Sequence, residues 1–243
     1  MLRFLPARLQ LRLHGLASAP LRERPYVVEV GGQSREVIHS RFNPAWLREA
    51  GIDPQVIVEL GAFDGGDAHP FKRAYPDARV VTVEADPDRI DVVRETLAGT
   101  GVEVHNFAAC DTDGPVQWYV SKINGATHGQ GSMYQHSEEY RRKFPHVKQA
   151  DAPIEVPGKR FETFCAEAGI EAIDLLHMDI EGAELSVLRS MGAVRPRLIY
   201  LEWRPEPFRG HDGTGSASDL LDRLEYRLVG DLGSDRLYRH AKG

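Results

Sequence analysis

Two short stretches of the chain carry residue types that can do chemistry. The first spans residues 59–66, with the letters ELGAFDGG, and the second spans residues 177–181, with the letters HMDIE. Glycine lets a backbone approach a ligand closely. Carboxylates and imidazoles can accept hydrogen bonds or protons. The sequence therefore predicts a ligand-binding turn in the first stretch and a reactive segment in the second.

The turn at residues 59–66 follows the apolar run VIVEL and precedes a helical stretch. Strand, glycine turn and helix form the arrangement in which nucleotide-like ligands bind at the carboxyl ends of parallel strands. Gly61 and Gly65 would let the backbone approach the ligand. Glu84, at the end of the next expected strand, can accept hydrogen bonds from both hydroxyls of a ribose. The alternative is a plain turn, with Glu84 as a solvated strand end.

Two acidic residues in this turn bear on the kind of ligand. A dinucleotide carries a pyrophosphate, which Glu59 and Asp64 would repel. The same carboxylates suit a ligand with an ammonium and a sulfonium centre. The turn therefore favours S-adenosylmethionine over a nicotinamide dinucleotide.

The elements around these stretches alternate short apolar runs with longer mixed segments, a pattern typical of βαβ units and a mostly parallel sheet. Strands are expected at residues 56–60, 78–85, 102–110, 173–180 and 197–203. Helices are expected at residues 44–51, 67–75, 87–98, 160–169 and 182–192. The tail after residue 215 predicts one helix and two short strands that close the sheet as an antiparallel hairpin.

Two regions depart from this alternation. Residues 111–159 lack its regular pattern and predict an inserted β-ribbon and loop, which we interpret as a functional lid. Residues 1–42 begin with an arginine- and leucine-rich stretch, which we interpret as an arm or helix packed on the domain. That stretch lacks the apolar core and cleavage site of a secretory signal. Contact with a membrane surface or a partner is the alternative.

Composition limits the classes of partner. The formal net charge of −6 disfavours a tight electrostatic grip on a nucleic-acid backbone. Since no run approaches the length of a membrane-spanning helix, no transmembrane segment is expected. Cys110 and Cys165 lie far apart without a metal-binding spacing, so a reducing cytoplasm fits best. We expect a small-molecule partner and no nucleic acid. The oligomeric state stays open, with a homodimer as one alternative.

Several blocks resemble the FkbM-type methyltransferases of the class I, Rossmann-like superfamily. VIVELGAFDG is similar to that family's first strand and turn, VTVEADPD to its second block and NFAACDTDG to the block after its third strand. IDLLHMDIEGAELSVL is the most specific match, and RPRLIYLEW resembles the closing strand. The chain departs from the pattern at Phe63 and Asp64, and at His177, where the family usually has lysine. The resemblance spans roughly residues 43–205.

The resemblance implies a single methyltransferase domain at residues 43–243, built as a three-layer α/β sandwich of the class I type. It places backbone near Ala108 and Ala109 against adenine, with Asp111 bounding the pocket. The resulting set of expected cofactor-binding residues is Glu59, Gly61, Ala62, Phe63, Asp64, Gly65, Glu84, Ala85, Ala108, Ala109, Asp111 and Asp179.

The segment HMDIE carries the expected reaction centre. His177 and Asp179 lie two residues apart on an expected strand, so they should share a face near its carboxyl end. Asp179 is the stronger catalytic candidate, with a helix N-cap as its alternative. His177 has a pKa suited to a general base, and a satisfied buried residue is its alternative. Glu202 could join Asp179 in binding a metal, with Glu181 nearby, and oxygen ligands would favour Mg²⁺.

Substrate-contacting residues are expected from both regions. Glu181 is one candidate, Ser132 and His128 of the insertion are two more, and the sequence does not choose between His128, His136 and His146. The family resemblance implies O-methylation of a hydroxyl on a sugar or natural product. A nicotinamide-dependent oxidoreductase and a non-catalytic S-adenosylmethionine-binding module are the alternatives, with an RNA methyltransferase as a weaker one.

Overall fold

A single large sheet organises the molecule. The computed structural model describes residues 12–13, 15–203, 208–209 and 217–243. The eight-stranded sheet has the order β1-β17-β18-β15-β14-β4-β5-β6. In that order the strands are Arg12–Leu13, Tyr226–Asp231, Asp235–His240, Leu198–Glu202, Leu175–Met178, Val56–Leu60, Arg79–Glu84 and Glu103–Asn106. Strands β15, β14, β4, β5 and β6 are parallel, whereas β18 and β17 form an antiparallel hairpin beside β15. The expected mostly parallel sheet with a closing hairpin is confirmed.

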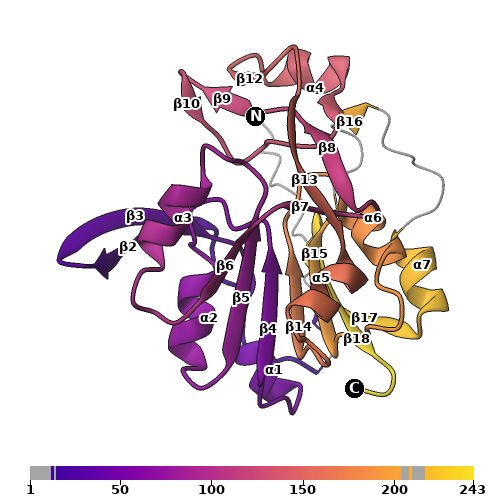
Figure 1. Ribbon diagram of the computed structural model, residues 1–243. Helices are drawn as coiled ribbons and strands as arrows, with labels where there is room; N and C mark the ends of the chain where they lie inside the picture. Colours follow the sequence, from indigo (N-terminus) through magenta and orange to yellow (C-terminus); the bar gives the residue numbers. More distant parts are fainter. Residues whose placement is uncertain (1–11, 14, 204–207, 210–216) are drawn as a thin grey trace, which may run out of the picture.

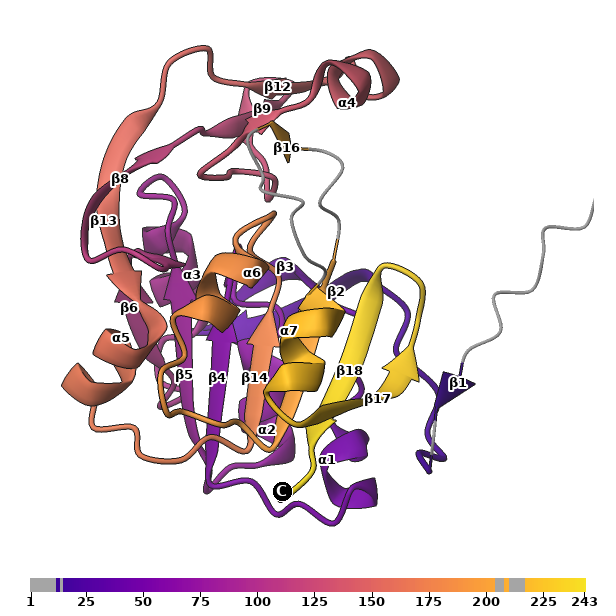
Figure 2. The same ribbon diagram turned by 90° about the vertical axis from the view of Figure 1, so that its right-hand side faces the viewer.

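Helices cover both faces of this sheet (Figures 1 and 2). The helices are α1 Ala45–Glu49, α2 Ala68–Ala74, α3 Ile90–Thr96, α4 Glu138–Lys143, α5 Phe161–Glu167, α6 Glu184–Arg189 and α7 Ala217–Arg223. Neighbouring strand residues face opposite ways, so Leu175 packs with α1, α2 and α3, while Leu176 packs with α5, α6 and α7. The strands read as continuous apolar runs because both faces are buried.

The insertion stands above the carboxyl ends of the parallel strands (Figure 2). It contains β8 Gly114–Trp118, β9 Ser121–Ile123, β10 Ala126–Thr127, β11 Gln135–His136, α4, β12 Val147–Gln149 and β13 Ile154–Arg160. Strand β13 pairs with β8 and with β7 Ala108–Cys110, whereas β9 pairs with β10 and β12, and β11 pairs with β16 Phe208–Arg209. The expected β-ribbon is present, and β13 pairs with β7, which follows β6 of the central sheet after one residue.

Within the N-terminal region, residues 24–39 form a β-hairpin where we expected an arm or helix packed on the domain. Residues 1–11 of the expected arm lie outside the described residues. Strands β2 Arg24–Val30 and β3 Gln33–His39 form a hairpin joined at Gly31 and Gly32, whose φ angles of 59° and 79° suit a tight two-residue turn. Alternation of buried and exposed positions, with Val28 and Val37 buried, makes this segment a strand pair. Across the described ranges, no helix combines the length and apolarity needed to span a membrane.

Candidate functional site

A cavity of about 270 Å³ lies where β4, β5 and β14 end. Its walls come from the glycine turn after β4, the ends of the strands, the end of the β2–β3 hairpin at residues 38–41, and the insertion. Ligands of open α/β sheets bind at this edge, because the carboxyl ends of parallel strands leave a crevice there. The fold therefore puts the glycine turn and the insertion around one space.

Gly61 lets the turn fit between two neighbouring strands. Its amide and that of Ala62 donate to the Val83 carbonyl at 2.9 and 3.1 Å. Gly61 has a φ of 93°, and a Cβ on it would lie 1.9 Å from the carbonyl oxygen of Asp179. A side chain is thus excluded by both conformation and space. Gly61, Ala62 and Phe63 all line the cavity, as the sequence predicted.

Glu84 ends β5 at the cavity wall. Its two carboxylate oxygens accept the amides of Phe63 and Asp86, each at 2.7 Å. Burial raises the pKa of this carboxyl to about 7. Each carboxylate oxygen retains a lone pair beyond the amide it accepts, so Glu84 can still receive ribose hydroxyls. The position agrees with the role that the sequence assigned to it.

Three expected cofactor residues from the turn at residues 59–66 are not among those that line the cavity: Glu59, Asp64 and Gly65. Asp64 turns back to accept the amides of Ile38 at 3.1 Å and Gly66 at 3.0 Å, and burial raises its pKa to about 6. Glu59 accepts the hydroxyl of Thr82 beneath the turn. Asp64 links the turn to the hairpin and Glu59 links β4 to β5, so the electrostatic argument for the cofactor does not rest on direct contact by either carboxyl group.

His177 is not among the residues that line the cavity; it lies behind the lining residue Ser40, on the sheet face that α2 covers. Thr82, Glu59, His177 and Tyr200 are register partners on adjacent strands, and all four are buried. The His177 ring stacks on Tyr200 with centroids 4.9 Å apart. Its Nε2 lies 3.0 Å from Ser40 Oγ, and burial lowers its pKa. These surroundings favour the buried polar residue over the cavity base. The strand ends at Met178, so the two-residue periodicity does not carry His177 and Asp179 to the same place.

Asp179 follows β14 and lines the cavity together with Glu181 and Glu202. One carboxylate oxygen from each of these residues lies within 4.8 Å of the others. The Asp179 amide donates to Leu60 at 3.0 Å, which fixes the segment beside the turn. Helix α6 is capped by Ala183 without a side-chain bond, so the alternative of Asp179 as its N-cap is not supported. Sequence reasoning therefore identified the three carboxylates that meet here.

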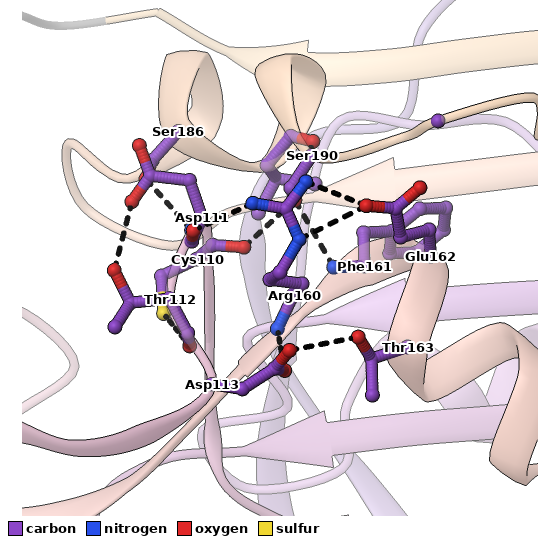
Figure 3. Close-up of polar contacts among 12 residues, drawn as sticks. Cys110, Asp111, Thr112, Asp113, Arg160, Phe161, Glu162, Thr163, Ser186 and Ser190 are labelled. Carbon is purple, nitrogen blue, oxygen red and sulfur yellow. Dashed lines mark hydrogen bonds and ion pairs between the residues drawn. The ribbon is translucent and has the colours of Figure 1, made fainter.

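Ala85, Ala108 and Ala109 line the cavity where adenine is expected, but Asp111 is not among the lining residues. Figure 3 shows Asp111 in a network of hydrogen bonds that links β7, β13 and α6. Its amide donates to Ser186 Oγ at 3.0 Å, and its carbonyl accepts Arg160 at 3.0 Å. Asp111 lies in this network and outside the cavity lining because β7 ends at Cys110, just before it.

The insertion contributes His128 to the cavity but not Ser132. Ser132 is fully buried, and its hydroxyl donates to the Glu181 carbonyl at 2.7 Å. It therefore supports the acidic segment from behind. His136 is also buried beside Tyr140 and is absent from the lining, while His146 is exposed outside it. Of the three histidines that the sequence left open, His128 is the one placed at the cavity.

The sequence missed cavity residues from the hairpin and from the start of α3. Ser40 lines the cavity, and its amide and hydroxyl donate to Asp67 at 2.9 and 2.8 Å. Arg89 also lines it and donates from Nε to the Phe63 carbonyl at 3.0 Å. The alternating pattern of residues 33–39 could have signalled the hairpin. Its position over the turn depends on long-range contacts.

Comparison with known proteins gives the family. The model of the FkbM methyltransferase domain matches residues 59–228. The 2-O-methyltransferase NoeI of Sinorhizobium fredii is 31% identical over 183 residues, which cover 71% of this chain and 73% of that protein. This chain belongs to the FkbM methyltransferase family. It is accordingly an S-adenosylmethionine-dependent methyltransferase, as the sequence predicted. The methyltransferase sdnD of Sordaria araneosa is 27% identical over 180 residues, covering 63% of this chain and 68% of that protein.

Solved structures of methyltransferases resemble the FkbM chain at low identity. The Podospora anserina methyltransferase PaMTH1, bound to S-adenosylhomocysteine, has a TM-score of 0.42 and 14% identity over 83% of this chain and 79% of that one. The O-methyltransferase TomG of Streptomyces achromogenes has a TM-score of 0.40 and 16% identity over 81% and 75% of the two chains. The fold assignment therefore rests on the strand order and the family match.

Two of the residues that depart from the FkbM pattern lie in different environments. Phe63 has a φ of 49° and lines the cavity, whereas His177 lies among the aromatic rings of Phe42, Phe71 and Tyr200. A neutral imidazole suits these buried surroundings, because burial penalises its charged form. The change at residue 63 therefore alters the cavity wall, while the change at residue 177 alters the core.

Proposed function

We propose that this methyltransferase transfers the methyl group of S-adenosylmethionine to a hydroxyl of a sugar or a sugar-like natural product, at the cavity wall formed by Asp179. The observation that carries the proposal is the meeting of Asp179, Glu181 and Glu202 beside the glycine turn. Carboxylate oxygens accept hydrogen bonds from hydroxyls. The relative NoeI is named a 2-O-methyltransferase, which supports oxygen as the acceptor atom.

The cofactor would lie across the ends of β4 and β5. Gly61 and Ala62 allow its methionine portion to approach the backbone, and Glu84 accepts the ribose hydroxyls. The backbone at Ala108 and Ala109 borders the space left for adenine. Asp179, whose backbone packs against Gly61, would then lie beside the methionine portion of the cofactor.

Methyl transfer displaces the sulfur when the acceptor oxygen attacks the methyl carbon in line with the breaking bond. The oxygen–carbon bond forms as the carbon–sulfur bond breaks, and the electron pair stays on sulfur. The protein then has to align the hydroxyl and exclude water. Asp179 would orient the hydroxyl by accepting its hydrogen bond and would take up the hydroxyl proton as the oxygen–carbon bond forms, and the insertion would cover the space. His128 is a second group that reaches the cavity from the insertion.

We also propose that a divalent cation such as Mg²⁺ can bind between Asp179, Glu181 and Glu202. Three carboxylates with oxygens within 4.8 Å of one another offer the hard donors that this ion prefers. A bound cation would lower the proton affinity of a coordinated hydroxyl. Dialysis against a chelator, followed by return of Mg²⁺, tests the requirement. Turnover that is unchanged by the chelator would remove the metal from the proposal.

Calorimetry and a methylation assay test the function itself. S-adenosylhomocysteine should bind the protein, whereas NAD should give no heat of binding. Labelled S-adenosylmethionine, presented with a panel of neutral glycosides and natural-product glycosides, should transfer label to a hydroxyl. Binding of NAD without a response to S-adenosylhomocysteine would indicate an oxidoreductase. Cofactor binding without transfer to any member of the panel would indicate a non-catalytic module.

A further inference from the structure

The backbone of Phe63 is held in a conformation that does not require its ring. Its φ of 49° lies in the left-handed region, where asparagine is enriched and bulky residues are uncommon. Its amide donates to Glu84 at 2.7 Å, and its carbonyl accepts Arg89 at 3.0 Å. Because these backbone bonds fix the turn, the aromatic side chain invites a separate explanation.

The Phe63 ring lies between the core and the insertion. On the core side, the Arg89 guanidinium carbon lies 4.2 Å from the ring centroid. On the insertion side, a Cβ on Gly129 would lie only 3.2 Å from Cδ2 of the ring. The His128 ring is 6.4 Å away, centroid to centroid. Phe63, Arg89, His128 and Gly129 all line the cavity, so this stack forms part of its wall.

The glycines of the insertion loop are required by closeness. The φ angles of Gly129 and Gly131 lie outside the left-handed region. A Cβ on Gly131 would lie 2.8 Å from Cζ2 of Trp118, as one on Gly129 would press on Phe63. The loop therefore packs closely against two rings: Trp118 of the insertion and Phe63 of the glycine turn.

We propose that Phe63 is a positioning residue whose ring is the contact on which the insertion rests when it covers the bound cofactor. The inference rests on the proposed function, because it assigns the cavity beside residues 61–63 to S-adenosylmethionine. The contact holds the loop at residues 128–131 over the cofactor, slows the release of the product and keeps water from the sulfonium. Phe63 acts through the loop and takes no part in bond making.

The variant Phe63→Asn removes the ring and keeps the backbone conformation of the turn, since asparagine tolerates this φ. With S-adenosylhomocysteine as the probe, stopped-flow measurement should show a dissociation rate about tenfold faster than that of the wild type. Hydrogen exchange at residues 126–133 should be slowed by the probe in the wild type and much less so in the variant. The melting temperature of the free protein should be maintained. Phe63→Leu provides a second ring deletion if the asparagine variant does not fold.

A double-mutant cycle tests whether the ring acts through Gly129. Gly129→Ala alone should speed dissociation about tenfold, because its methyl group presses on the ring. Added to Phe63→Asn, the same change should have little further effect, since the clash has gone. Gly125→Asn is the matched control in the insertion. Asparagine tolerates a left-handed φ such as the 84° of Gly125, and nothing lies within 4 Å of a Cβ there, so dissociation of the probe from this control should match the wild type.

The outcomes separate the inference from the function on which it rests. Dissociation in Phe63→Asn within twofold of the wild type, or additive effects of the Phe63 and Gly129 changes, would overturn the positioning role. In either case, wild-type binding of S-adenosylhomocysteine would still support the methyltransferase. Absence of binding to the wild type would instead overturn the cofactor assignment and, with it, the inference.

Discussion

Two clusters of acidic and imidazole side chains meet at β14, and their surroundings differ. Glu59, Asp67 and His177 form one cluster, and Asp179, Glu181 and Glu202 form the other; in each, one ligand atom per residue lies within 4.8 Å of the rest. In the first, Glu59 and His177 are sealed inside the sheet face, and Asp67 alone of the three lines the cavity. All three members of the second line it.

The two clusters differ more in their access to the cavity than in the types of residue that form them. Glu59 Oε1 and His177 Nδ1 are buried without a hydrogen-bond partner among the described residues. Burial raises the pKa of Glu59 well above its usual value and lowers that of His177, so both groups favour their neutral forms. We therefore interpret the buried cluster as part of the packed core. Carboxylates at the cavity wall can instead meet a ligand.

The largest expected effect is at the open cluster. Asp179→Ala should lower kcat/KM at least about 100-fold, because the acceptor hydroxyl loses the group that orients it. Calorimetry should find the affinity for S-adenosylhomocysteine within about threefold of the wild type. Asp77→Ala, at an exposed position before β5, is the control and should keep full activity. Unchanged turnover in Asp179→Ala would remove Asp179 from the reaction centre.

The sealed cluster should respond in stability more than in chemistry. His177→Ala would leave a cavity beside Tyr200, Phe71 and Phe42, which we expect to cost about 2 to 3 kcal/mol of unfolding free energy. Chemical denaturation measures this loss, and His146→Ala, at an exposed position, is the matched control. The kcat of the folded variant should change less than about threefold. A stable but inactive variant would instead point to a catalytic His177.

Glu84 lies between the two cases, because it is buried and also lines the cavity. Its pKa of about 7 makes the ionised fraction rise between pH 6 and pH 8. The ionised carboxylate is the better acceptor for ribose hydroxyls, so S-adenosylhomocysteine should bind about tenfold more tightly at pH 8 than at pH 6. Calorimetry on Glu84→Gln should give weaker binding with little dependence on pH. An equal pH dependence in the variant would assign the titration to another group.

The smallest expected effect is at Glu59. Burial raises its pKa well above the usual value, which favours the protonated form of the carboxyl in the folded protein. Glu59→Gln should therefore change the unfolding free energy by less than about 1 kcal/mol near pH 4, where the carboxyl is protonated in the folded and the unfolded chain alike. Because folding raises the pKa of this carboxyl, its contribution to wild-type stability should be full at low pH and should fall as the pH rises toward the folded pKa. Glu59→Gln should show no such fall. A large loss at pH 7 would mean that Glu59 is ionised.

Much of the fold could be predicted from the sequence. Continuous apolar runs located the parallel strands, and the expected span 56–60 coincides with β4. Gly61 and Glu84 line the cavity, and the signal for both was local: a strand, a glycine turn and an acid at the end of the next strand. The same local logic placed Asp179 beside the turn.

The errors came from side-chain direction and from segments that depend on distant partners. Asp64 lies in the turn, yet its carboxylate faces the hairpin because the Ile38 amide is there. His177 was assigned the surroundings of Asp179, although β14 ends between them. Ser132 was expected at the substrate but supports the Glu181 carbonyl. In each case the partner lies far away in sequence.

By itself, the sequence determined the order of strands and helices, the glycine turn, its acidic partner on β5 and the carboxylates after β14, because these depend on periodicity and local backbone conformation. The tertiary structure decided which of these side chains reach the cavity. It set the β2–β3 hairpin over the turn, placed the insertion against Phe63 and enclosed His177 among aromatic rings. Those outcomes depend on packing between segments far apart in the chain, which no local pattern encodes.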